Sequence, residues 1–387
     1  MVEAHPPRIP LPFALDRNPH APEAERRLLD WARRHDLLDH ADAEKRLVGA
    51  RLGDLAAYTH PDAEPDRLVL YAQFIAWQFL THDRYAEPDE RTATGREHLT
   101  AQVEPVYRTG RVDPAAGPMA RALADILGRV YPAMSADWRE RFVVEGLETL
   151  RHVLPRPPGG PRTAGRDHAG GVEAYVRHRR FACGQFPCLL LDEYMAGGEL
   201  PVMIRDGAAY DDVRNAQADV VSWTSDYYAS RDSAGSGAGR GADSGAGSGA
   251  DVATDLVGVL AYTEHVGRAH AESAVAARIQ DRVADFLSAR RELQGGKSAA
   301  ALADPATDLV LRRCVSAMHH RMAGTEAWAW ENVRSIDRRR GADGAGDARS
   351  ARDAEGGLRV PEFVEDLLDV RGRPRGWDGG AAGHRWP

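Results

Sequence analysis

Apolar side chains recur at helical spacing along most of this chain, whereas the alternating Val, Ile and Thr runs typical of β-strands hardly appear. In residues 22–38, positions such as Leu28 and Trp31 mark one apolar face of a helix. Residues 68–80 are almost continuously apolar and aromatic, which predicts a buried helix. The same spacing predicts helices over residues 138–153, 172–194, 209–228, 255–266, 271–293 and 307–330. The sequence therefore predicts an all-α fold, a large helical bundle.

Charge and cysteine content narrow the class of protein. Of 387 residues, 43% are hydrophobic, which is enough for a sizeable core. A formal net charge of −8 argues against a nucleic-acid binder, because such proteins need a basic field to meet phosphates. Three cysteines, spaced wrongly for a metal clamp, argue against a disulfide framework. The proline-rich start lacks a signal-peptide core and no run nears the ~20 apolar residues of a membrane helix. We therefore expect a cytoplasmic protein with no stable membrane insertion.

Composition also divides the chain into segments. We expect a disordered N-terminus over residues 1–12 and one helical domain over residues 13–337. Residues 230–253 are nearly all Gly, Ala, Ser and Asp, so we interpret them as a flexible insertion within the helical series. Residues 338–387 turn again to Arg, Gly, Asp and Ala and predict a mostly disordered tail.

An acidic segment follows the buried helix of residues 68–80. Asp83 and Glu87 stand four residues apart, so their carboxylates share one face if the helix continues. Two converging carboxylates at the end of an apolar helix suit Mg²⁺ ions bound to a diphosphate. The alternative is a solvated, acidic helix end.

Two further segments carry groups that suit an anion or a cation. Arg179 and Arg180 precede Gly184, which suggests guanidinium groups presented to phosphate near a helix break. A basic surface turn is the alternative. Ser222 and Asp226 stand four residues apart among apolar residues and could share an oxygen-ligated cation, although this spacing is common by chance.

The last predicted helix is rich in tryptophan near its end. Arg334 follows Trp328 there, and such an arginine could close an aromatic pocket and reach an anion. An exposed arginine on an amphipathic helix is the alternative. No one of these segments is decisive by itself, so their order and separations carry the argument.

In that order, the segments resemble the motifs of bacterial class I terpene synthases over about residues 12–335. The family's acidic motif, which follows a W-x-F segment, is similar to Trp77, Phe79, His82, Asp83 and Glu87. Its RRxxxG phosphate-sensor segment is similar to Arg179, Arg180 and Gly184. Its NDxxSxxxE metal triad falls on Ala218, Asp219, Ser222 and Asp226. Its C-terminal W…RY element falls on Trp328, Arg334 and Ser335.

The departures from the family's pattern concern metal and phosphate ligands. His82 stands where the principal metal-binding Asp sits, and Ala218 replaces the triad Asn and has no donor atom. Asp226 replaces Glu and has a shorter reach, while Ser225 and Ser335 replace a frequent Lys or Arg and a Tyr. Mg²⁺ prefers hard oxygen ligands, so His82 would favour Mn²⁺ or another transition metal. A polar residue at a helix end is the alternative for His82.

The resemblance implies a class I terpene synthase-like α-helical bundle around a central apolar cavity. It implies a terpene cyclase, a carbon–oxygen lyase that ionises a linear isoprenoid diphosphate such as farnesyl or geranyl diphosphate and cyclises the carbocation. The implied cofactor is Mg²⁺, or Mn²⁺, on Asp83, Glu87, Ser222, Asp226 and His82. The implied catalytic residues are Arg180, the phosphate sensor, and Arg334. The implied substrate-binding residues are Arg179, Cys183, Gly184, Phe74, Trp77, Phe79, Phe181 and Trp328.

Two other functions stay open on the same scaffold. A non-catalytic homologue would bind a prenyl diphosphate or a partner protein, and His82 and Ala218 favour it. A repurposed enzyme such as a prenyltransferase would need an acceptor molecule. Homologous folds often dimerise, so a homodimer is compatible with the resemblance.

Overall fold

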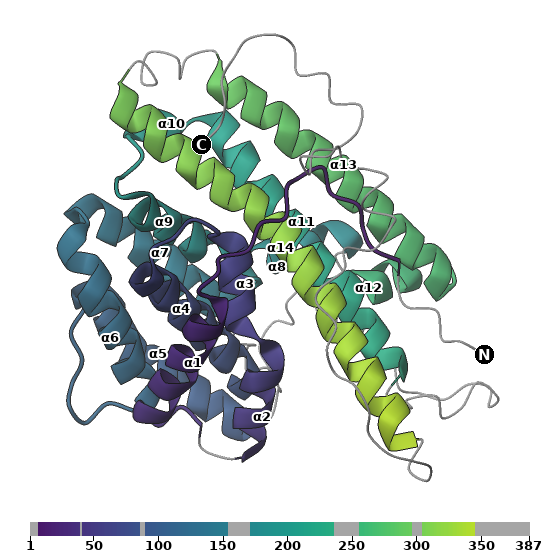
Figure 1. Cartoon of the computed structure of the whole chain (residues 1–387), viewed down its shortest axis with the longest axis horizontal. Helices are drawn as coiled ribbons and strands as arrows, with labels where there is room; N and C mark the ends of the chain where they lie inside the picture. Colours follow the sequence, from purple (N-terminus) through teal and green to yellow (C-terminus); the bar gives the residue numbers. More distant parts are fainter. Residues whose placement is uncertain are drawn as a thin grey trace.

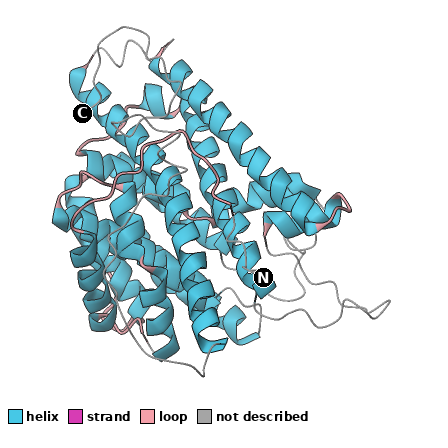
Figure 2. Ribbon diagram, turned by 45° about the vertical axis from the view of Figure 1, so that its right-hand side comes forward, coloured by secondary structure: helices cyan, strands magenta, loops and turns pink. Residues whose placement is uncertain are grey.

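The computed structural model describes residues 7–38, 41–85, 90–153, 171–235, 255–295 and 304–344. Every regular element in those ranges is a helix (Figure 2), so the all-α prediction is confirmed. Within the same ranges, no helix combines the length and the apolar character needed to cross a membrane.

The helices follow one another with short connections. The first seven are α1 (Ala21–Arg34), α2 (Ala41–Ala50), α3 (Leu52–Thr59), α4 (Pro65–Tyr85), α5 (Glu90–Thr109), α6 (Pro118–Val130) and, after the 3₁₀ turn η1 (Tyr131–Ala133), α7 (Ala136–Val153). The others are α8 (Gly171–Ala182), α9 (Gln185–Ala196), α10 (Val202–Arg205), α11 (Ala208–Gly235), α12 (Leu256–Thr263), α13 (Arg268–Gln294) and α14 (Pro305–Gly344).

The helices bury two apolar cores. The first joins α1 and α3–α7 and contains three fully buried indoles, of Trp31, Trp77 and Trp138. The second joins α8–α14 and contains Tyr228 and Phe286. In Figure 1, α1–α7 form one half of the molecule, and the long helices α11, α13 and α14 lie together beside it. Helix α14 connects the halves, because it packs on α11 as well as on α3 and α9.

The helix predicted over residues 172–194 is interrupted at Gly184, which separates α8 from α9. Gly184 has a φ of +70°, a left-handed conformation that costs a residue with a Cβ about 1–2 kcal/mol. Gln78 Nε2 on α4 donates to the Gly184 carbonyl at 3.1 Å. The break between the two helices is therefore docked against the middle of α4.

Three predicted boundaries differ from the helices that form. Residues 230–235, expected to begin the flexible insertion, continue α11, and α14 extends past residue 338 to Gly344. Residues 7–12 follow the body of the molecule, since Ile9 is only 3% exposed and Arg8 pairs with Glu326 of α14. Residues 236–254 and 345–387 lie outside the described ranges.

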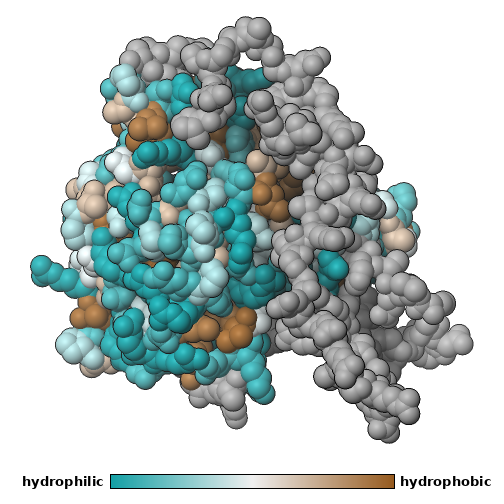
Figure 3. Space-filling view, viewed as in Figure 1, coloured by the Kyte–Doolittle hydropathy of each residue, from teal (hydrophilic) through white to brown (hydrophobic). Residues whose placement is uncertain are grey.

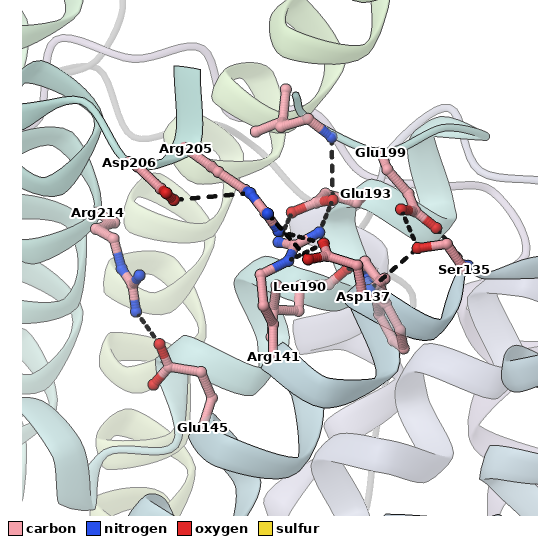
Figure 4. A network of polar contacts seen from close by, with 12 residues as sticks. Ser135, Asp137, Arg141, Glu145, Leu190, Glu193, Glu199, Arg205, Asp206 and Arg214 are labelled. Atoms are coloured by element: carbon pink, nitrogen blue, oxygen red, sulfur yellow. Dashed lines mark hydrogen bonds and ion pairs between the residues drawn. The ribbon is translucent and has the colours of Figure 1, made fainter. Parts of the chain in front are cut away.

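Charged pairs join the two halves at one side. Figure 4 shows α7 linked to α9, α10 and α11 by such pairs. In one of them, Arg141 donates to both carboxylate oxygens of Glu193 at 2.8 and 3.0 Å. The face of the α1–α7 half in Figure 3 is mostly hydrophilic and broken by small apolar patches.

Candidate functional site

A cavity of about 270 Å³ lies between α3, α4, α7, α8, α9, α11 and α14. Apolar and aromatic side chains make much of its wall. These are Leu52, Leu55, Tyr71, Ile75, Trp77, Phe79, Tyr107, Leu150, Val153, Val221 and Trp328. Such a wall, with few polar groups, is typical of small-molecule sites.

Helix α4 gives the cavity a long axis. Tyr71, Gln78 and His82 all line it, and the helical rise of 1.5 Å per residue puts Tyr71 and His82 about 16 Å apart along the axis. Arg321 of α14 lies at the Tyr71 end, where its Nε donates to the Tyr71 hydroxyl at 3.1 Å. Trp328, two turns further along α14, donates to the carbonyl of Ala50 on α2 at 2.6 Å. We call the two ends the Tyr71 end and the His82 end.

Most of the predicted aromatic residues line this cavity, and two do not. Trp77, Phe79 and Trp328 are part of its wall. Phe74 is fully buried behind it, with its ring centroid 5.7 Å from that of Phe142. Phe181 packs on His152 and Phe186 instead, with ring centroids 5.0 and 5.1 Å away.

The two arginines of α8 face different partners. Arg179 lines the cavity and holds Asp226 of α11 through Nε at 3.0 Å and Nη2 at 2.9 Å. Burial alone would lower the pKa of Arg179, but the charge of Asp226 raises it above its ordinary value. Tyr175 donates to the other oxygen of Asp226 at 2.6 Å. The backbone N–H of Leu256 donates to that oxygen at 3.3 Å.

Arg180, the predicted phosphate sensor, is held outside the cavity wall. Its Nε and Nη2 donate to the two oxygens of Asp219 at 2.7 Å each. Arg282 of α13 donates to the same carboxylate at 2.9 Å. Because successive residues of a helix are about 100° apart, Arg179 and Arg180 cannot face the same partner. Arg179 is the α8 guanidinium that an anion in the cavity would meet.

Hydroxyl and thiol groups complete this side of the cavity. Ser222 and Ser225 of α11 line it, and their hydroxyls donate to the carbonyls of Asp219 and Val221 at 3.1 and 3.0 Å. Cys183 and Gly184 also line it, at the end of α8. Burial raises the pKa of the Cys183 thiol to about 11, so it stays protonated at neutral pH.

The acidic motif lies at the His82 end of the cavity. His82 lines the cavity and is exposed. Asp83 points elsewhere: its carboxylate pairs with Arg46 of α2 at 2.9 Å. Glu87 lies outside the described residues.

The donors that α11 presents do not fit a divalent metal in this arrangement. Asp226 already accepts hydrogen bonds from Arg179, Tyr175 and Leu256, and Ala218 has no donor atom. A metal ion on Asp226 would have to displace the guanidinium. Within the described ranges, no three His, Cys, Asp or Glu side chains are grouped so that they could hold a metal.

Arg334 also lies away from the cavity wall. Its guanidinium carbon lies 4.3 Å from the centroid of the Trp330 ring, a cation–π contact within α14. The predicted pair of catalytic arginines, Arg180 and Arg334, is therefore not brought together on the cavity wall in this conformation.

A buried polar cluster at the Tyr71 end was missed by sequence reasoning. Arg321 and Tyr71 line the cavity, and Asp192 of α9 pairs with Arg321 at 2.5 Å. A signal for it existed: Arg321 stands at helical spacing between Met318 and Trp328, inside an otherwise apolar face.

Comparison with known proteins assigns the family. The sequence model described as "Terpene synthase family 2, C-terminal metal binding" matches residues 73–285, more than half of the chain. The chain is 30% identical over 291 residues to (-)-delta-cadinene synthase of Streptomyces clavuligerus, covering 74% of this chain and 82% of that protein. It is 27% identical to pristinol synthase of Streptomyces pristinaespiralis, covering 83% and 82% of the two chains.

Solved structures agree on the fold. Germacradien-4-ol synthase from Streptomyces citricolor superposes with a TM-score of 0.69 at 22% identity, covering 84% of this chain and 98% of that one. An a-eudesmol synthase superposes with a TM-score of 0.68 at 21% identity, covering 84% and 99%. The helical bundle and its cavity are thus those of the class I terpene synthase fold. By the family match and the similarity to (-)-delta-cadinene synthase, this chain belongs to the bacterial class I terpene synthase family.

Proposed function

We propose that this chain is a terpene cyclase, a carbon–oxygen lyase that ionises a linear isoprenoid diphosphate such as farnesyl or geranyl diphosphate. The observation that carries the proposal is the cavity itself, whose aromatic wall meets the Arg179 guanidinium at one side. The relatives named above are synthases of terpenes, which supports the same class of reaction here.

The chain's own residues would bind the leaving group on the α8–α11 side. Arg179 has five N–H donors, and Asp226 engages its Nε and Nη2, so donors are left for phosphate oxygens. The hydroxyls of Ser222 and Ser225 can turn toward the same anion. The allylic C–O bond would then break with its electron pair going to the diphosphate, where charge-assisted hydrogen bonds stabilise the developing charge.

The aromatic wall would hold the carbocation. Trp77, Phe79 and Trp328 present π systems to the cavity, and an aromatic face attracts a cation. The apolar wall also keeps bulk water from the reacting chain. Ring closure would then follow the shape of the cavity, with no protein nucleophile.

We include a divalent metal in the proposal only as a requirement to be tested. The family's description names metal binding. On α11, however, the Arg179 guanidinium occupies the carboxylate that would hold the ion. The proposal for this side of the cavity therefore places a guanidinium, and we route no step through a metal.

The second candidate is a non-catalytic homologue that binds a prenyl diphosphate or a partner protein. One observation favours it: both carboxylates of the α11 motif, Asp219 and Asp226, are already satisfied by arginines. A protein of this kind would bind the diphosphate and release it unchanged.

Product analysis by gas chromatography–mass spectrometry separates the candidates. The purified protein would be incubated with geranyl, farnesyl and geranylgeranyl diphosphates, in Mg²⁺, in Mn²⁺ and with a chelator. We expect a terpene product that Arg179→Ala reduces about 10²–10³-fold, as loss of a key anion-stabilising donor does. Arg180→Ala is the matched control, because Arg180 lies outside the cavity wall and should reduce turnover less.

Either outcome is informative. A larger loss in Arg180→Ala than in Arg179→Ala would return the sensor role to Arg180 and contradict this assignment. Binding of the diphosphates without turnover in either metal would make the non-catalytic homologue the better description.

A further inference from the structure

A buried polar cluster closes the Tyr71 end of the cavity. Four different elements supply it: His60 follows α3, Tyr71 lies on α4, Asp192 on α9 and Arg321 on α14. Arg321 Nη2 donates to Asp192 Oδ1 at 2.5 Å, and Arg321 Nε donates to the Tyr71 hydroxyl at 3.1 Å. His60 Nε2 lies 3.4 Å from the same Asp192 oxygen.

This cluster is almost completely buried and its hydrogen bonding is incomplete. Asp192 is 1% and Arg321 2% exposed. Among the described residues, nothing hydrogen-bonds to Arg321 Nη1 or to Asp192 Oδ2. A buried polar atom left without a partner costs about 1–3 kcal/mol, so such atoms usually have an ordered water or a ligand group.

The two unpartnered atoms complement each other. Arg321 Nη1 is a donor and Asp192 Oδ2 is an acceptor, and the two side chains are already joined through their other atoms. One water molecule can accept from the first and donate to the second, which gives it the two to four polar partners that a buried water needs. The ion pair is also neutral as a whole, so it does not repel a carbocation as a lone guanidinium would.

The cluster lies far from the groups that would hold the diphosphate. Tyr71 and His82 are about 16 Å apart along α4. Arg179 and Ser222 belong to α8 and α11, whereas Asp192 lies two turns beyond the α8–α9 break. A prenyl chain whose head group lies at Arg179 would therefore point its cationic carbons toward Arg321 and Asp192.

The charges of the cluster are stable at neutral pH. Burial lowers the pKa of His60, so this ring is neutral at pH 7. Burial raises the pKa of Tyr71 well above its ordinary value, so its hydroxyl keeps its proton.

We propose that Arg321 and Asp192 hold a water molecule that captures the carbocation at the Tyr71 end of the cavity, so that this chain makes a hydroxylated terpene. The inference rests on the proposed cyclase activity. In the step, the water oxygen forms a C–O bond to the cationic carbon, and the resulting oxonium gives one proton to Asp192 Oδ2. The product is a terpene alcohol, and the two residues select it over an alkene.

The test is product analysis in water enriched in ¹⁸O, with the substrate and metal condition that give turnover. We expect the main product of the wild-type protein to be an alcohol that carries ¹⁸O. The double variant Arg321→Leu with Asp192→Leu removes both charges together, so that neither remains buried alone. In it, the alcohol-to-alkene ratio should fall about tenfold or more, the effect of losing about one such buried hydrogen bond.

A matched control keeps a general loss of stability from imitating this result. Arg141 and Glu193 also form a buried pair on α9 (Figure 4), but neither lines the cavity. Arg141→Leu with Glu193→Leu should leave the alcohol-to-alkene ratio unchanged. Tyr71→Phe removes only the hydroxyl that Arg321 contacts and should shift the ratio in the same direction, but less.

A crystal structure of the wild-type protein tests the water without any variant. We expect an ordered water within hydrogen-bonding distance of both Arg321 Nη1 and Asp192 Oδ2, and a dry contact there would overturn the inference. Turnover to alkenes alone, or an unchanged ¹⁸O alcohol in the double variant, would overturn it while leaving the cyclase intact. No product from any of the diphosphates would instead overturn the proposed function, and this inference with it.

Discussion

The two sides of the cavity are built by different interactions. The α4 side is a wall of apolar and aromatic groups, in which Trp77 packs fully buried against the first core. The α8–α11 side is built from ion pairs, in which Arg179 holds Asp226 and Arg180 holds Asp219. Burial of apolar area has no direction, whereas each ion pair depends on which way one side chain points.

This difference separates shape from chemistry. The α4 wall determines the space in which a carbocation could fold. The α8–α11 side determines whether an anion or a metal meets a free group. Changes on the first side should alter products, and changes on the second should alter turnover.

The largest expected effect is on the α4 side. Trp77→Ala should lower the free energy of unfolding by about 3–5 kcal/mol, because a fully buried indole is replaced by a cavity. It should also remove the hydrogen bond from Trp77 Nε1 to the Met119 carbonyl, 2.8 Å long. Urea denaturation measures the first effect and product analysis measures the change of cavity shape.

Trp138→Ala is the matched control for that variant. Trp138 is also fully buried, and its indole donates to the Leu190 carbonyl at 3.1 Å, but it does not line the cavity. We expect a similar loss of stability without a change in the product ratio. If Trp138→Ala changed the product as much as Trp77→Ala, the α4 wall would have no special role in shaping it.

The next effect tests the ion pair on the other side. A double-mutant cycle of Arg179→Ala and Asp226→Ala should give a coupling energy of about 2 kcal/mol, as close charge pairs in a buried network do. Arg179→Ala alone should cost the most, because it leaves the Asp226 carboxylate buried without its cation. Denaturation midpoints of the four proteins measure the coupling.

The same cycle sharpens the question of metal binding. Titration of Mn²⁺ into Arg179→Ala should show tighter binding than in the wild type, since Asp226 is released from its guanidinium. Equal Mn²⁺ affinity in the two proteins would mean that Arg179 does not compete with a metal for Asp226.

A smaller effect concerns pH and the second core. Burial, with the nearby charge of Arg290, lowers the pKa of His319 to about 3. The ordinary pKa in the unfolded chain is about 6.5, so between these values the unfolded state binds more protons. Stability should therefore fall as the pH drops from about 6.5 toward 3, by at most about 1.4 kcal/mol per pH unit for this group.

His319→Phe should flatten that pH dependence, because the ring already stacks on Phe13 with centroids 4.9 Å apart. His98→Gln, at an exposed position on α5, should leave it unchanged. Denaturation series from pH 7 to pH 4 make the comparison, and an unchanged slope in His319→Phe would assign the pH dependence to other groups.

The two sides of the cavity also differ in how far the sequence predicts them. Apolar spacing predicts α4 as a buried helix, and the W-x-F resemblance places Trp77 and Phe79 at the cavity. The ion pairs are different, because Arg179 and Arg180 are equivalent in the sequence. Their separation depends on the rotation of α8 and on Arg282, a partner 63 residues beyond Asp219. Only the packed structure supplies both.

Gly184 belongs to both sides, and its substitution is the smallest expected effect. In Gly184→Ala the new Cβ would lie 2.9 Å from Gln78 Nε2, and the φ of +70° would be strained. We expect a loss of about 1 kcal/mol of stability from the left-handed conformation. Gly197→Ala is the matched control, since Gly197 has a φ of +81° but meets only Arg67, 3.9 Å away.

Because both variants carry the same backbone cost, their difference reports the docking of the α8–α9 break on α4. Gly184→Ala should move Gln78 and Cys183, both of which line the cavity, and so change turnover or product ratio. Gly197→Ala should change only the denaturation midpoint. If the two variants behaved alike in product analysis, the break would be a structural turn, and the two sides of the cavity would act independently.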